Sequence, residues 1–187
     1  EGAWRALSVR IPADRLRWAR AIRLIPGERG ALVGLADGRV FHVEDTRVLA
    51  AHRAAEIRAI GFAGPDEGWA LGRATQDESG VGRTAVALRW DGRRWAPLSH
   101  DHPLVQALAV DVAVVSERNA WAVGPMGAIL HFDGNAWSTV PSPTAADLHR
   151  VVAVAPDLVL ALGTAWIGPG DVHQSLVLLF DGATWRI

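Results

Sequence analysis

Four polar residues recur at one place in a repeated sequence, and three of them are arginines. Each opens a similar apolar run, and together they are Arg20, Arg58, Gln106 and Arg150. Guanidinium groups gathered around one centre can bind an anion or a carboxylate through paired hydrogen bonds. They can also hydrogen-bond the loop carbonyls of a neighbouring repeat and so fasten the repeats together, which is the interpretation we favour. Under either interpretation these residues are candidate ligand-binding residues around a common centre.

Histidine and tryptophan supply the other candidate contacts. His100 and His102 are separated by one residue, and His173 lies in a different loop, so the three side chains could ligate a metal. A zinc site requires three or four ligands and an ordered outer shell, and a solvated polar turn is the simpler interpretation. We therefore expect no metal and no other cofactor. Trp166 lies outside the repeated positions, which makes it a ligand contact or a cap on the adjacent repeat.

No set of residues in the chain indicates a reaction. Serine-centred elbows, glycine-rich phosphate loops and helical metal motifs are absent from the sequence. Glycoside hydrolysis requires a matched pair of carboxylates in a cleft, and nothing sets two of the loop acids apart as such a pair. We expect a non-catalytic protein. The alternative is a glycoside-hydrolase-like enzyme whose catalytic residues lie partly in missing repeats.

The elements that must position these residues are the strands of four consecutive repeats, near 15–52, 57–98, 106–140 and 150–187. The clearest copy predicts strands at Ala120–Gly124, Ala128–Phe132 and Trp137–Val140, separated by turn residues. A further strand precedes these three, and it is expected to begin at the recurrent Arg or Gln. A four-stranded meander cannot bury both of its faces alone, whereas radial stacking of such sheets buries them. The sequence therefore predicts an all-β fold, a β-propeller of four-stranded antiparallel blades, in preference to a linear β-solenoid.

Repeated residues within each blade have packing roles. A Trp follows the Asp-Gly turn in three copies and suits the widening gap between blades. The Asp can accept hydrogen bonds from backbone N–H groups of its own turn, and the Gly supplies a positive φ. The Gly that closes each second strand leaves room for a close neighbouring backbone. Most of the nine Trp residues are therefore expected to be scaffold.

Two long loops join second to third strands, within 73–84 and 164–175, and these loops emerge on the same side as the blade-to-blade connections. Binding residues are concentrated on loops that a rigid scaffold carries. This side is therefore the expected working face, with a carbohydrate or an anion as a possible small ligand.

Composition limits the classes of partner that the chain could bind. The chain has 187 residues, a net charge of −1, no Cys and only Arg among its 19 basic residues. With so little net charge, and a local excess of only +4 in residues 1–60, we expect no nucleic acid partner. No apolar run is long enough to span a membrane. The Arg, Ala and Gly bias favours a bacterial source.

The run WAVGPMGAILHFDGNAW, which starts at Trp121, resembles the propeller repeats of exported bacterial proteins. The related families are the sialidase-type (BNR, Asp-box) and the photosystem-assembly-factor-like repeats. The turn at Asp133–Trp137 is one residue shorter than an Asp-box, and the tyrosine nucleophile of sialidases has no counterpart, because Tyr is absent. The resemblance implies a binding or assembly scaffold in an extracellular or cell-envelope protein.

The segment Trp4–Val9 looks like an outer strand without its three companions. It predicts that upstream repeats are lost, that the strand completes a blade in another chain, or that four blades close a ring with a strand to spare. An unpaired strand exposes backbone N–H and C=O groups that can pair with another chain. We therefore expect a protein partner or self-association through the ends of the propeller.

Overall fold

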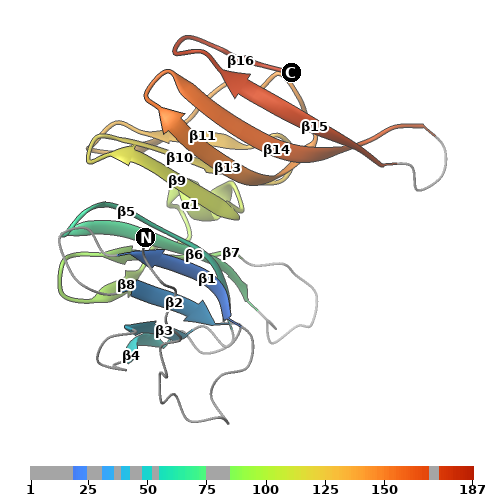
Figure 1. Ribbon diagram of the computed structural model, residues 1–187. Helices are drawn as coiled ribbons and strands as arrows, with labels where there is room; N and C mark the ends of the chain where they lie inside the picture. Colours follow the sequence, from blue (N-terminus) through green and yellow to red (C-terminus); the bar gives the residue numbers. More distant parts are fainter. Residues whose placement is uncertain are drawn as a thin grey trace, which may run out of the picture.

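The computed structural model describes residues 19–24, 31–35, 39–42, 48–51, 55–74, 85–168 and 173–187, and these are almost entirely β-structure. The described strands form four antiparallel sheets of four strands each, which lie one beside the next along the molecule (Figure 1). Within every sheet the strands pair in the order in which the chain makes them. The predicted β-propeller of four-stranded antiparallel blades is confirmed.

The first two blades come from the N-terminal half of the chain. Blade 1 comprises β1 (Ala19–Leu24), β2 (Ala31–Leu35), β3 (Arg39–His42) and β4 (Val48–Ala51). Blade 2 comprises β5 (Ala55–Gly64), β6 (Glu67–Ala74), β7 (Ala85–Trp90) and β8 (Trp95–Pro97).

A short helix, α1 (Pro103–Gln106), leads into the C-terminal half. Blade 3 comprises β9 (Asp111–Ser116), β10 (Asn119–Val123), β11 (Ile129–Phe132) and β12 (Trp137–Thr139). Blade 4 comprises β13 (Asp147–Ala155), β14 (Leu158–Trp166), β15 (His173–Phe180) and β16 (Trp185–Arg186).

The first strand of each blade faces a central channel. Neighbouring inner strands contact one another from β1 through β5 and β9 to β13, and all four line the cavities along this channel. Among the described residues, β13 and β1 do not pack against each other as the other neighbours do. Within the described residues, blades 1 and 4 therefore lie at the two ends of the series, and each has one face that no other described blade covers.

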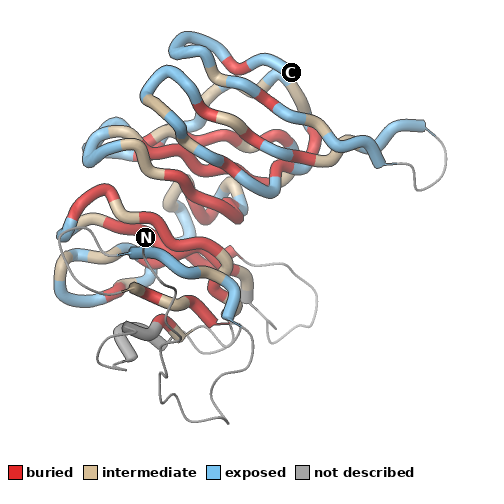
Figure 2. Tube along the Cα trace, viewed as in Figure 1, coloured by how far each residue is buried: buried red, intermediate tan, exposed pale blue. Residues whose placement is uncertain are grey.

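Apolar cores fill the three spaces between successive blades. Figure 2 shows buried residues concentrated where one sheet faces the next. Leu32 and Val40 of blade 1 pack with Ile57, Ile60 and Trp95 of blade 2. Equivalent cores join blade 2 to blade 3 and blade 3 to blade 4. Stability therefore arises between sheets, because each sheet buries its faces only against its neighbours.

The same aromatic arrangement recurs in two of these cores. Trp69 of blade 2 lies 4.7 Å from Phe132 and 5.1 Å from Trp137 of blade 3, between ring centroids. One blade further on, Trp121 lies 4.7 Å from Phe180 and 5.4 Å from Trp185. The two Trp–Trp pairs are edge-to-face, a favourable aromatic geometry. The predicted scaffold role of the Trp that follows the Asp-Gly turn is confirmed.

The Asp-Gly turns close as the sequence predicts. The Oδ1 atom of Asp133 accepts hydrogen bonds from the backbone nitrogens of Asn135 and Ala136, at 2.8 and 2.9 Å. Gly134 has a φ of 95°, which favours glycine. The turns at Asp91 and Asp181 repeat both features.

The glycines expected to close the second strands have the predicted packing role, but two of them do not end their strands. β6 continues past Gly72 to Ala74 and β14 continues past Gly163 to Trp166, so Trp166 and His173 are paired strand residues and not loop residues. A Cβ atom at Gly163 would lie 2.7 Å from the carbonyl oxygen of Asp147, and one at Gly72 would clash with the carbonyl oxygen of Glu56. Both contacts are with the inner strand of the same blade, so glycine lets the two backbones approach closely.

The inner strands differ from their predicted first residues, most of all in blade 3. β5 begins at Ala55 instead of Arg58, and β13 begins at Asp147 instead of Arg150. The inner strand of blade 3 was expected to begin at Gln106, but Gln106 ends helix α1, and β9 begins at Asp111. His102 caps this helix by accepting a hydrogen bond from the nitrogen of Leu104, and Pro103 occupies the first turn, where proline is favoured. The helix displaces the strand by five residues along the chain. The segment Trp4–Val9 lies outside the described residues, and no helix within them could span a bilayer.

Candidate functional site at the mouth of the channel

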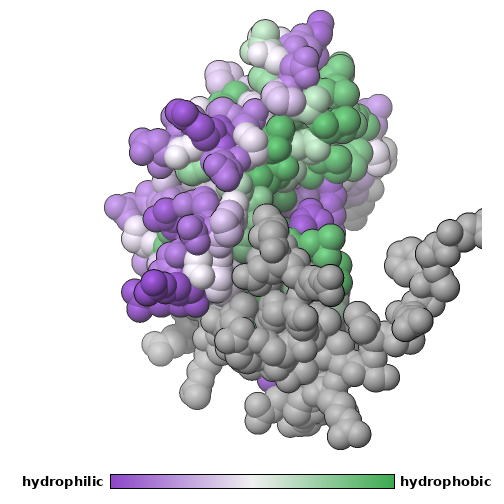
Figure 3. Space-filling model, turned by 60° about the vertical axis from the view of Figure 1, so that its left-hand side comes forward, coloured by the Kyte–Doolittle hydropathy of each residue, from purple (hydrophilic) through white to green (hydrophobic). Residues whose placement is uncertain are grey.

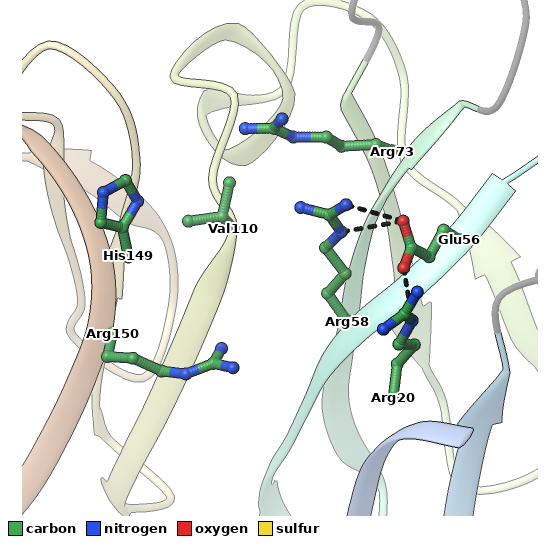
Figure 4. Close-up of a pocket in the computed structure, with 7 residues that line it drawn as sticks. All are labelled: Arg20, Glu56, Arg58, Arg73, Val110, His149 and Arg150. Atoms are coloured by element: carbon green, nitrogen blue, oxygen red, sulfur yellow. Dashed lines mark hydrogen bonds and ion pairs between the residues drawn. The ribbon is translucent and has the colours of Figure 1, made fainter. Parts of the chain in front are cut away.

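One end of the central channel opens into a cavity of about 390 Å³. Its lining side chains come from the inner strands of blades 1, 2 and 4, from β6, and from the residue before β9 (Figure 4). They are Arg20, Glu56, Arg58, Arg73, Val110, His149 and Arg150. Four guanidinium groups thus face one carboxylate, which makes the mouth of the channel strongly cationic.

Glu56 organises two of these arginines. Its Oε1 lies 2.7 Å from Nε of Arg20, and its Oε2 accepts from Nε and Nη2 of Arg58, at 3.1 and 2.7 Å. Arg20 belongs to blade 1 and Glu56 to blade 2, so the ion pair links the two blades. The expected acceptor for these arginines was a loop carbonyl of a neighbouring repeat, whereas Arg20 reaches the next blade through a carboxylate.

Arg150 stands on the opposite side of the cavity. Its side chain extends from β13 toward the side occupied by Arg58 and Arg20 (Figure 4). No ion-pair partner of Arg150 is found among the described residues, although the buried carboxylate of Asp111 lies close enough to interact electrostatically. Arg150 is thus the cation of this mouth that is most open to an incoming anion.

Asp111 holds the position at which a glutamine was expected. It pairs with Val123, the residue before the strand-closing Gly124, just as Arg150 pairs with Leu162 before Gly163. Only 7 % of Asp111 is exposed, and its Oδ2 accepts a hydrogen bond from the backbone nitrogen of Val151 at 2.9 Å. Burial raises its pKa above the ordinary value of 3.8, while this hydrogen bond and the nearby Arg150 act in the opposite direction.

A second cavity, of about 550 Å³, adjoins the first on blade 4. His149 lines both cavities, so the two form one continuous surface. Trp166 is 68 % exposed there, and its indole N–H donates to the carbonyl oxygen of Gly168 at 2.9 Å. His149 lies 3.1 Å from the hydroxyl of Thr164, which positions its ring between the two cavities. The remaining lining residues are Ala145, Ala146, Asp147 and His173.

The other candidates have structural contacts. His102 caps helix α1, and burial lowers its pKa. His100 is exposed, and its carbonyl oxygen accepts a hydrogen bond from the side-chain nitrogen of Gln106 at 2.6 Å. Across the described part of the chain, no three His, Asp or Glu residues gather in a way that would hold a metal ion. Neither histidine nor Gln106 lines the cavity at the channel mouth.

Sequence reasoning missed Glu56, His149 and Asp111. Glu56 lies two residues before Arg58 on one strand, and residues at this spacing share a face of a sheet. That pattern was available in the sequence. His149 precedes Arg150 at a β-bulge, between the pairs Leu148–Gly163 and Arg150–Leu162. A bulge redirects a side chain, and no sequence signal marks this one.

No protein-family model and no curated protein matches the chain. The fold resembles that of the solved structure of YCF48 bound to D1 peptide, with a TM-score of 0.51 at 14% identity. That match covers 79% of this chain and 49% of the other. A structure of YCF48 from Cyanidioschyzon merolae has a TM-score of 0.47 at 17% identity, with 74% of this chain and 38% of the other covered.

The fold is that of a β-propeller. The similarity to YCF48 agrees with the photosystem-assembly-factor side of the sequence resemblance, at the level of fold. These comparisons do not show the sialidase-type resemblance or a bacterial source. The chain spans about half or less of the length of the solved structures it matches.

Proposed function

We propose that this chain is a non-catalytic binding scaffold whose channel mouth holds an extended acidic segment of a partner protein. The observation that carries the proposal is the placement of four arginines around one cavity, where Glu56 is the one carboxylate among the described lining residues. A carboxylate ligand could replace the solvent around Arg150 and form charge-assisted hydrogen bonds, which are about twice as strong as neutral ones. The solved YCF48 structure that contains a D1 peptide supports a peptide as the ligand class. An extracellular or cell-envelope location remains part of the proposal.

The second cavity indicates the direction in which the bound segment would run across the surface. A chain bound at Arg150 reaches the Trp166 cavity by crossing His149, which lines both. The exposed indole can pack against an apolar or aromatic side chain of the segment. The proposed ligand is therefore a peptide with acidic residues at one end and an apolar residue a few positions away.

Fluorescence anisotropy with two labelled peptides tests this proposal. The first probe is Gly-Phe-Gly-Asp-Glu-Asp with a free carboxyl terminus, and the second is Gly-Phe-Gly-Asn-Gln-Asn with an amidated terminus. The acidic probe should bind at least about tenfold more tightly, and added salt should weaken its binding because exposed charges are screened. Equal binding of the two probes would overturn the proposal.

Two substitutions test where on the protein the acidic probe binds. Arg150→Gln should weaken binding of the acidic probe by roughly tenfold, the value of one lost charge-assisted contact. Arg94→Gln is the matched control, because Arg94 lies in the turn between β7 and β8, outside both cavities, and pairs with Asp91. Equal losses from the two substitutions would indicate a diffuse effect of net charge instead of a site.

Trp166 can be tested with a double-mutant cycle. Trp166→Ala should weaken binding of the acidic probe but not that of a version with Gly in place of Phe. If both probes lose affinity equally, Trp166 does not contact the apolar residue. Binding of a neutral oligosaccharide that is abolished by Trp166→Ala would instead assign the second cavity to carbohydrate.

A further inference from the structure

Blade 4 exposes an apolar sheet face on the side away from blade 3. Alternation along its strands buries one set of residues against blade 3 and turns the other set outward. The outward set, named here the open face, consists of Val152, Val154, Leu158, Leu160, Leu162, Val177 and Leu179. Figure 3 shows a broad hydrophobic area over the upper part of the molecule, where blade 4 lies.

Strand register shows that this face is continuous. Val152 pairs with Leu160, which in turn pairs with Leu179. Leu162 pairs with Val177 in the adjoining row. Cross-strand neighbours on one face have Cβ atoms about 5 Å apart, so these side chains form a single patch of Val and Leu.

The same register positions are covered in the two preceding blades. Trp121, Val123 and Ile129 of blade 3 correspond to Leu160, Leu162 and Val177, and all three are buried under blade 4. Trp69, Leu71 and Ala87 hold these positions in blade 2 and are buried under blade 3. By contrast, Leu162 is 44 % exposed and Val177 50 %. The established interfaces therefore continue into a face that has no sheet partner among the described strands.

The size of the patch favours an interface. Half-exposed Val and Leu side chains leave the open face with on the order of 450 Å² of apolar surface, at the upper end of what monomers usually show. Two such faces in contact would bury roughly 900 Å² from these side chains alone, near the lower limit for specific interfaces. Backbone and rim atoms add to that area.

We propose that the open face of blade 4 packs against the open face of a second copy of this chain, around a two-fold axis. Such an interface requires only one self-complementary patch, and two-fold dimers are the commonest assemblies. Arg150 and Arg186 extend the two rows of the open face, because they pair with Leu162 and Leu179. The contact is therefore limited to the Val and Leu side chains between them, with these guanidinium groups at its edge. Sheet-on-sheet contact also repeats the packing mode that the opposite side of blade 4 already uses.

Blade 1 is a poorer partner for this face. Each core between two blades of one molecule contains a Trp from the later blade of the pair, at the start of its outer strand. These residues are Trp95, Trp137 and Trp185. The outer strand of blade 1 starts at Val48 instead. A head-to-tail contact would therefore lack the aromatic plate that fills the internal interfaces, whereas two open faces need no such plate.

Sedimentation equilibrium of the 187-residue chain tests the proposal. The wild type should approach twice its mass of 20.0 kDa as concentration rises. Val177→Glu and, separately, Val154→Glu should raise the dimer dissociation constant at least about 100-fold, because each buries unpaired charges. Thermal unfolding of both variants checks that they fold, and Val154 lies near the end of β13, where a substitution disturbs the sheet least.

Met126→Glu is the matched control, because Met126 is an exposed apolar residue between β10 and β11 of blade 3 and lines neither cavity that Val152 lines. It should leave the mass of the dimer unchanged. A wild-type chain that stays monomeric at every concentration overturns the proposal, and so does a dimer that survives both glutamates on blade 4. A dimer lost in Met126→Glu overturns the assignment of the contact to the open face.

Cysteine cross-linking gives a readout that does not depend on destabilising the interface. The chain contains no Cys, so a single introduced thiol can be oxidised only against another copy. Leu179→Cys or Val177→Cys should give a covalent dimer under mild oxidation, because a two-fold axis brings equivalent positions together. Met126→Cys should remain a monomer on a non-reducing gel. The opposite pattern would rule out contact between the two open faces.

Discussion

Asp111 joins blade 3 to blade 4: its Oδ2 lies 2.9 Å from the backbone nitrogen of Val151 on the neighbouring inner strand. This contact occurs at the level of the channel where Arg20, Arg58 and Arg150 also face inward. The carboxylate therefore contributes both a backbone hydrogen bond between blades and a negative charge below the cationic mouth.

Replacing Asp111 with Asn should stabilise the fold at neutral pH. Burial raises the pKa of Asp111 above 3.8, so the ionised carboxyl is less favourable in the folded than in the unfolded chain. Stability of the wild type consequently falls as pH rises from 3.8 through the raised pKa and stays lower above it. Asn carries no charge and can still accept the N–H of Val151. Its advantage, measured by urea unfolding, should be largest at pH 7 and should vanish below pH 3.8.

Asp111→Ala is the control for the hydrogen bond. It leaves the N–H of Val151 without an acceptor and should cost about 1–3 kcal/mol. An Asn variant that is less stable than the wild type at pH 7, yet equal to it in acid, would show that attraction between Asp111 and Arg150 outweighs burial.

Trp137→Ala should destabilise the chain by roughly 3–5 kcal/mol, as the truncation of a buried aromatic does. Trp137 is buried between blades 2 and 3, where it packs edge-to-face on Trp69. Trp166→Ala should cost less than about 1 kcal/mol, because Trp166 is exposed. Chemical denaturation monitored by circular dichroism measures both. Similar losses at the two positions would contradict the division into scaffold and surface tryptophans.

Asp133→Ala should lower the melting temperature, and Asp133→Asn should recover part of the loss. The side chain accepts two backbone hydrogen bonds in its turn, and these lower the pKa of Asp133. Its stabilising contribution is therefore complete above pH 3.8 and is lost as pH falls through the lowered pKa. Differential scanning calorimetry between pH 2 and pH 7 should show the wild type and the Ala variant converging in acid. A constant difference across this range would exclude the carboxylate as the cause.

Glu56→Gln should tighten binding of the acidic probe by about three- to tenfold, because it removes the carboxylate that opposes the ligand. It also releases Arg20 and Arg58 from their ion pairs. Glu67→Gln is the control, since Glu67 holds Arg89 in a similar two-bonded pair outside both cavities. Anisotropy titrations should detect no change for that variant. Weaker binding by Glu56→Gln would mean that Glu56 must hold Arg58 in place for the ligand.

The sequence predicted strand bounds best where the turn residues and the apolar alternation indicate the same boundary. In blade 3, Ala128–Phe132 and Trp137–Val140 were expected, and the strands are Ile129–Phe132 and Trp137–Thr139. The inner strand was misplaced because QALAVDVAVVS contains two overlapping apolar alternations, and period-two reasoning cannot choose between them. Pro103 could have distinguished the two alternatives, because proline is favoured in the first turn of a helix and so indicates a helix before the strand. The cationic mouth was predicted only in part, because a bulge at His149 redirects this side chain in a way that alternation does not predict.

The aromatic groups that hold this protein together are out of phase with its covalent repeat. Trp69 is encoded with blade 2, but Phe132 and Trp137, which complete its cluster, are encoded with blade 3. A duplication or deletion that cuts between whole sheets would therefore leave half a cluster on each side of the cut. A cut just after the second strand does the same, because this cluster spans the seven strands from β6 to β12. Each aromatic cluster therefore forms only between two consecutive repeats, and an isolated repeat would lack it.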